Sequence, residues 1–268
     1  MNPVISASIC PHCGFSAAGT FADCPRCGVI IEKYMRLQQE GGPDSASDLD
    51  PRSADESIDE ETESPWSWQN FAAEVLYVPE AVPLIAFGGR VLLFLGLLIP
   101  GVRYMLSPLD AEVFSGFLHL INLPFHEAGH LVFRPFGDFI ASLGGSLGQI
   151  LMPTICMGVF LVQNRDPFAG SVALWWVGQN FMDIAPYVND ARAGVMPLLG
   201  GNTGQTAPYG FHDWEYLLTE TGLIRYDHTI ALLSHGAGCL LMLTAVAWSG
   251  FLLWKQYHRL ESGADGSL

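Results

Sequence analysis

Apolar residues are gathered in long runs in the second half of the chain, whereas residues 40–64 are almost entirely polar. A helix that crosses a bilayer needs about 20 predominantly apolar residues, and helices satisfy their own backbone hydrogen bonds in lipid. Five runs approach or exceed this length: 84–106, 113–133, 140–162, 168–188 and 229–254. We therefore predict a mainly α-helical, polytopic membrane helix bundle with about four to six spans.

The third of these runs is less regular than the others. It carries Gly144, Gly145, Gly148 and Pro153, residue types that disfavour a continuous helix. Irregular backbone at membrane depth is tolerated where protein surrounds it or where it lines a cavity. We expect residues 140–153 to form a re-entrant segment.

The N-terminal residues have a different pattern. Two CPxCG turns supply four thiols, from Cys10, Cys13, Cys24 and Cys27. This spacing is typical of a closed, tetrahedral structural zinc site, and zinc would supply the folding energy of so small a module. We predict a zinc ribbon with a docking or regulatory role, the alternative being two disulfides or an iron site. No secretory signal opens the chain, so we expect the ribbon to be cytoplasmic.

Charge is distributed unevenly along the chain. The formal net charge is −15, and residues 40–64 hold ten acids against Arg52 alone. Such a segment cannot bury enough apolar surface to fold. There is no basic stripe, which argues against nucleic-acid binding. We divide the chain into a zinc ribbon (1–35), an acidic disordered linker (36–70), a membrane-embedded domain (71–262) and a tail (263–268).

The second apolar run contains the sequence His126-Glu127-Ala128-Gly129-His130. Residues four apart lie on one face of a helix, so the two imidazoles can bind one zinc ion. Glu127 follows the first histidine and can act as general base on a metal-activated water. We predict a catalytic zinc site here, in addition to the structural one.

Two histidines do not complete a catalytic zinc site, which usually has three protein ligands. Asp213 is more readily explained as the start of a helix over residues 213–218, and His119 as a hydrogen-bonding partner of the site. The possible third ligands are Asp183, Asp190, His212, Asp213, His119 and His235.

The chain resembles the site-2 protease family of intramembrane zinc metalloproteases over about residues 85–200. The resemblance lies in HEAGH within a membrane segment, the glycine-rich patch 144–149, and a stretch with Asn180, Pro186 and Asp190. It implies that Asp190 is the third zinc ligand. Asn-Asp-Ala-Arg stands where the family has Leu-Asp-Gly, which leaves Asp183 and His212 as alternatives.

The resemblance also implies that Asn180 and Gln149 contact substrate. Close helix packing is the alternative explanation for the glycine-rich patch around Gln149.

These observations lead to a functional expectation. We expect an integral, multi-pass membrane protein that acts as an intramembrane zinc metalloprotease on transmembrane protein substrates, with a soluble protein as partner of the ribbon. The alternatives are a non-proteolytic zinc-binding membrane scaffold or metal-handling protein, and a membrane hydrolase acting on a non-peptide bond. A ribbon with a catalytic site predicts two zinc ions per chain, whereas a ribbon-only scaffold predicts one.

Overall fold

The computed structural model describes residues 7–12, 15–25, 29–40, 68–79, 82–107, 109 and 116–265. Helices make up most of this part of the chain, which confirms the mainly α-helical prediction. The chain divides into two compact units, Met1–Thr62 and Glu63–Leu268. Most of the predicted acidic linker lies outside the described residues.

The N-terminal unit is a small hairpin followed by a helix. Strands β1 (Ala7–Ile9) and β2 (Ser16–Phe21) pair antiparallel, and α1 spans Ile31–Glu40, so residues 36–40, assigned above to the linker, are helical. Cys10 and Cys24 are buried with Ile31 in a common cluster. Cys13 and Cys27 lie outside the described residues, so the zinc ribbon stays a prediction.

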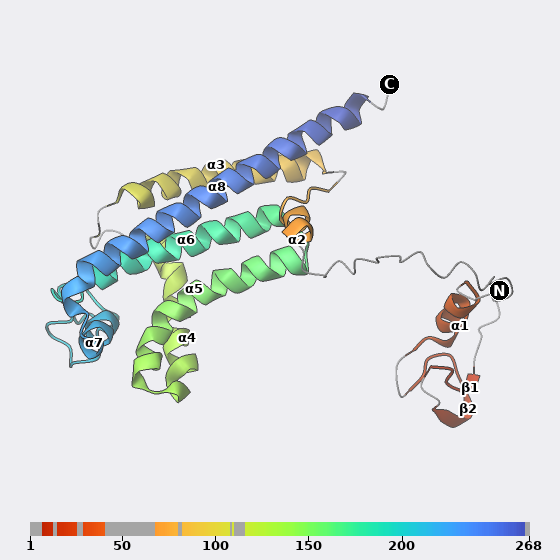
Figure 1. Cartoon of the computed structure of the whole chain (residues 1–268), viewed down its shortest axis with the longest axis horizontal. Helices are drawn as coiled ribbons and strands as arrows, with labels where there is room; N and C mark the ends of the chain where they lie inside the picture. Colours follow the sequence, from red (N-terminus) through yellow and green to blue (C-terminus); the bar gives the residue numbers. More distant parts are fainter. Residues whose placement is uncertain are drawn as a thin grey trace, which may run out of the picture. The chain divides into compact units, whose positions relative to one another are not determined.

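The second unit is built from helices (Figure 1). Its elements are α2 (Trp68–Val75), α3 (Leu84–Leu106), α4 (Phe117–Phe133), the 3-10 turn η2 (Arg134–Phe136), α5 (Asp138–Val162), α6 (Pro167–Asn189), α7 (Asp213–Glu220), the 3-10 turn η3 (Ile224–Tyr226) and α8 (Asp227–Asp265). The long helices α3, α8, α6 and α5 run alongside one another, and α4 packs on α5.

Three stretches of helix are long and apolar enough to cross a membrane: Leu84–Leu106, Asp138–Val162 and Ile224–Leu260. Many of their apolar side chains point outward, and Ile85 is 91% exposed. Apolar surface on this scale is typical of contact with lipid or another protein. Helix α4 has 17 residues, a length of about 25 Å, which is short for a full span. The number of spans beyond three stays a prediction.

Helix α6 forms the interior of the bundle, where most of its residues are buried. It packs against α8 through Gly178 and Gly238, where a Cβ at Gly178 would lie 2.8 Å from the carbonyl oxygen of Gly238. Small residues allow this close approach of two backbones. Arg90 of α3 pairs with Asp166, the residue that caps α6, at 2.9 Å. This ion pair compensates the charge that the sequence places within the first apolar run.

We predicted a re-entrant segment with irregular backbone at residues 140–153. This prediction is wrong, because α5 runs through these residues as a continuous helix. Its glycines serve a different purpose, which is close packing against α4. A Cβ at Gly148 would lie 2.4 Å from the carbonyl oxygen of Phe125, and one at Gly129 would meet the backbone of Gly144. The packing alternative for the glycine-rich patch therefore describes the structure. This close crossing brings the HEAGH turn of α4 directly against α5.

Candidate metal site

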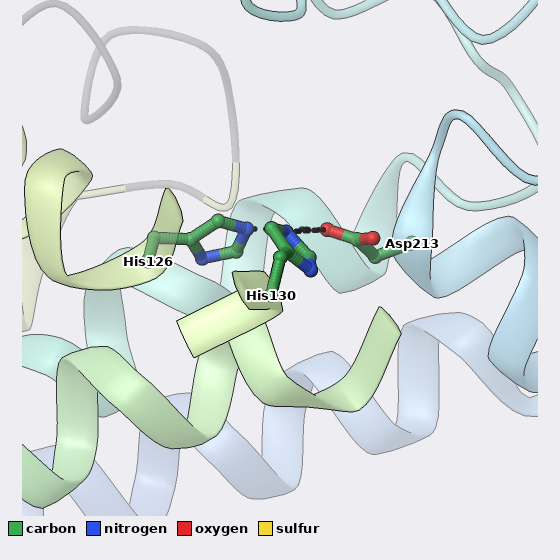
Figure 2. A group of neighbouring side chains, drawn as sticks. All are labelled: His126, His130 and Asp213. Carbon is green, nitrogen blue, oxygen red and sulfur yellow. Dashed lines mark hydrogen bonds and ion pairs between the residues drawn. The ribbon is translucent and has the colours of Figure 1, made fainter. Parts of the chain in front are cut away.

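His126 and His130 project from one face of α4 toward Asp213, the first residue of α7 (Figure 2). The carboxylate oxygen Oδ2 of Asp213 lies 3.1 Å from Nε2 of His126 and 3.3 Å from Nε2 of His130. One ligand atom from each of the three residues lies within 4.8 Å of the others. Among the described residues, this is the one group of three such side chains that meets in this way.

The second nitrogen of each imidazole is engaged by an oxygen atom. Nδ1 of His126 lies 2.8 Å from Oε1 of Gln149, and Nδ1 of His130 lies 2.8 Å from the carbonyl oxygen of Ala141. Both oxygens can only accept, so each Nδ1 carries a hydrogen and each neutral ring has its lone pair on Nε2. This is the tautomer that a metal ligand requires. Two lone pairs of neutral rings would face one carboxylate oxygen, so positive charge must lie between them, either from a metal ion or from a hydrogen on Nε2.

Helix α5 leaves space at the point where the two imidazoles meet. A Cβ built on Gly145 would lie 2.5 Å from Nε2 of His126 and 2.6 Å from Nε2 of His130. Any side chain at this position would intrude on the two Nε2 atoms. Two imidazole nitrogens and a carboxylate oxygen are ligands that zinc accepts, at distances of about 2.0–2.2 Å. The donor set and the glycine together fit a zinc ion.

Asp213 is held in place from several directions. Ser142 of α5 donates a hydrogen bond to its Oδ1 at 3.0 Å, and its backbone N–H donates to the hydroxyl of Tyr187 on α6 at 3.0 Å. Burial raises the pKa of Asp213, but hydrogen bonding to Nε2–H of His126 and His130 when these rings are protonated outweighs burial and lowers the pKa to about 2. The side chain is therefore an anionic carboxylate at neutral pH.

Asp190, the third ligand implied by the family resemblance, lies elsewhere in the structure. Its two carboxylate oxygens accept hydrogen bonds from the backbone N–H groups of Val195 and Met196, at 3.0 and 2.9 Å. These bonds close the turn that follows α6. Asp213 stands beside the histidine pair in place of Asp190, because the loop after α6 folds back and brings the start of α7 to α4.

His212, an alternative third ligand, is fully buried and caps α7. Its Nδ1 accepts the backbone N–H of Glu215 at 3.2 Å, and its Nε2 lies 3.5 Å from Asp190. Burial lowers the pKa of His212, although the nearby Asp190 opposes the shift. A neutral ring that accepts at Nδ1 carries its hydrogen on Nε2, so His212 has no lone pair left for a metal.

Asp183, the other alternative, is also fully buried, on α6. It accepts hydrogen bonds from His119, Asn122 and Gln149 and is not part of the group formed by His126, His130 and Asp213. The expectation that His119 is a hydrogen-bonding partner is consistent with its contact to Asp183, at 3.1 Å from Nδ1 to Oδ2.

The two side chains expected to contact substrate are both buried. The amide of Gln149 is engaged at both ends, by His126 and by Asp183. Asn180 donates to the carbonyl oxygen of Trp176 at 3.0 Å and is 0% exposed. The described structure thus gives both amides contacts within the bundle and leaves their proposed role in substrate binding without support.

A cavity of about 890 Å³ opens in front of the histidine pair. Glu127 is exposed and lines this cavity, together with both histidines and Asp213. Apolar residues of the loop before α7, among them Leu198 and Phe211, form another part of its wall. The cavity therefore joins a polar end, which contains the histidine pair and Asp213, to an apolar side.

Comparison with known proteins yields no relative. No protein-family model, curated protein or solved structure matches this chain.

Proposed function

We propose that this chain is an intramembrane zinc metalloprotease in which His126, His130 and Asp213 hold the catalytic zinc ion. One observation carries the proposal: both Nδ1 atoms are engaged by acceptors, so both Nε2 lone pairs converge with the Asp213 carboxylate beside Gly145. Asp213 takes the role that the family resemblance assigned to Asp190. The resemblance to site-2 proteases supports the proposed reaction through the HEAGH sequence.

Glu127 is the proposed general base. A bound zinc ion would supply a water with a pKa near 7 and would polarise the scissile carbonyl. Glu127 follows His126 directly and lines the same cavity, which supports its proposed role of accepting a proton from an attacking water. The same carboxyl group then donates that proton to the leaving amine.

The size and the lining of the cavity support a segment of a membrane protein as the proposed substrate. Its volume of about 890 Å³ lies within the usual range of ligand-binding pockets. Apolar side chains such as Leu198 and Phe211 offer contacts to an apolar segment, and the polar end admits water for hydrolysis. Location in a membrane follows from the three apolar helices, and we propose a multi-pass topology with the N-terminal unit in the cytoplasm.

The N-terminal unit is the proposed docking or regulatory module. Cys10 and Cys24 each begin a CPxCG turn, and both are buried against Ile31. Together with Cys13 and Cys27 they would hold a second, structural zinc ion. A soluble protein partner is the proposed ligand of this module.

The test combines metal content with cleavage of a single-span reporter protein in detergent micelles. Glu127→Ala should retain zinc and lose cleavage, because the base does not bind the metal. Asp138→Asn is a matched control, since Asp138 lines the same cavity but lies outside the histidine–aspartate group. Cleavage that is lost only in Glu127→Ala supports the protease. A zinc-loaded wild type whose cleavage equals that of Glu127→Ala would instead indicate a metal-handling protein or scaffold.

A further inference from the structure

A buried polar network connects the candidate metal site to the interior of the bundle. At its centre is Asp183, which is 1% exposed. Its Oδ2 lies 3.1 Å from Nδ1 of His119, 3.1 Å from Nδ2 of Asn122 and 3.4 Å from Nε2 of Gln149. A buried carboxylate is costly unless donors surround it, and here donors from α4 and α5 do so.

The hydrogen bonds of this network have a fixed direction from donor to acceptor. The NH₂ group of Gln149 faces Asp183, because its Nε2 donates to Oδ2 of Asp183 at 3.4 Å. The carbonyl oxygen of the same amide then faces Nδ1 of His126, at 2.8 Å. Because that oxygen can only accept, the hydrogen of the neutral ring stays on Nδ1 and the lone pair on Nε2.

We propose that Asp183 is a positioning residue that acts through Gln149 to fix the tautomer of His126, and so keeps Nε2 of His126 available to a metal. This inference rests on the proposed metal site. Without Asp183, the amide of Gln149 could turn over and present its NH₂ group to Nδ1. The ring hydrogen would then move to Nε2, which would donate to Asp213 instead of binding metal.

The two histidines differ in this respect. Nδ1 of His130 faces the backbone carbonyl oxygen of Ala141, and a backbone carbonyl cannot exchange a donor for an acceptor. Nδ1 of His126 faces a side-chain amide, which can do so by rotation. The tautomer of His126 therefore depends on the orientation of the Gln149 amide. The hydrogen bond to Asp183 fixes that orientation.

The experiment is a Co²⁺ titration of the full-length, metal-depleted protein, followed by visible absorption. Subtracting the signal of a His126→Ala/His130→Ala variant isolates the membrane-domain site from any other cobalt. We expect Asp183→Leu and Gln149→Leu to weaken Co²⁺ binding by about 10- to 100-fold, the effect usual for loss of a partner behind a metal-bound histidine. Asn180→Leu is the matched control, because Asn180 is a buried amide on the same helix that donates to the backbone carbonyl oxygen of Trp176; it should retain wild-type affinity.

A swapped pair of residues separates positioning from general damage to the bundle. In Asp183→Asn/Gln149→Glu, the new amide can donate to the new carboxylate, which in turn accepts from Nδ1 of His126. The double variant should bind Co²⁺ at least about tenfold more tightly than Gln149→Leu, with the absorption bands of the wild type. The inference would be overturned if the double variant bound Co²⁺ as weakly as Gln149→Leu while keeping wild-type helix content. Wild-type Co²⁺ affinity in Asp183→Leu would also overturn it.

Failure of this inference can be told apart from failure of the proposed function. If the His126→Ala/His130→Ala variant binds as much Co²⁺ as the wild type, the metal site itself is wrong. If that variant loses one Co²⁺ ion while Asp183→Leu and Gln149→Leu keep full affinity, the site stands and the role of Asp183 is refuted.

Discussion

Replacing Gly145 by alanine tests the packing of α5 against the histidine pair. The added methyl carbon would lie 2.5 and 2.6 Å from the two Nε2 atoms, whereas unstrained carbon contacts are about 3.5 Å. Both rings, or the helix, must therefore move by about 1 Å. Metal–ligand distances tolerate only about 0.2 Å, so Gly145→Ala should lose the zinc ion of this site. The strain should also destabilise the fold by about 1–3 kcal/mol.

Gly158→Ala provides the matched control on the same helix. A Cβ at Gly158 meets nothing within 4 Å, so this variant should keep its zinc. Alanine also favours helix over glycine by about 0.5–1 kcal/mol. Both variants are assayed by zinc content and by denaturant unfolding in the same detergent. A Gly145→Ala protein that keeps both wild-type zinc and wild-type stability would refute the close approach of α5 to the histidines.

The remaining predictions concern the general base, the loop before α7, the α7 cap and the N-terminal unit. Glu127→Ala should keep both zinc ions and cleave no reporter, measured side by side on one preparation. Asp190→Asn should lower stability by about 1–2 kcal/mol, because one backbone N–H loses its acceptor, yet keep the zinc of the membrane domain; loss of that zinc would return Asp190 to the ligand set. His212→Ala should cost about 1 kcal/mol of unfolding free energy through loss of the α7 cap, and His212→Asn should cost less. Replacing Cys24 and Cys27 by serine should remove one zinc ion and unfold the N-terminal unit, seen as faster proteolysis there, while zinc in the membrane domain is retained.

Local patterns were sufficient to predict the histidine pair. The i, i+4 spacing of His126 and His130 places both imidazoles on one helix face whatever the rest of the fold, and α4 confirms that placement. The apolar runs likewise correspond to helices, because long apolar segments have few other structures available in lipid.

The third member of the site depends on tertiary structure that local patterns do not encode. Asp213 was among the possible third ligands, but the start of a helix was the preferred explanation for it, and α7 does begin at Asp213, with His212 as its cap. The path that brings Asp213 to α4 is set by turns with positive φ, such as at Gly194, and by the bonds of Asp190 to the following backbone. A His-Asp pair at a helix start within a glycine-rich loop was the one available signal.

The glycines of α5 show why the expected irregular segment was wrong. Glycine weakens an isolated helix, but it also allows two helices to approach closely. In Gly144 and Gly148 the second effect prevails, because the backbone of α4 lies against them. Only the partner helix reveals which effect applies.

The most direct test of the central claim is zinc content in full-length protein, comparing wild type with Asp213→Asn and His126→Ala/His130→Ala. The account predicts two zinc ions per wild-type chain and one in each variant, the remaining ion belonging to the N-terminal cysteines. Zinc content that is the same in all three proteins would contradict a metal site formed by His126, His130 and Asp213.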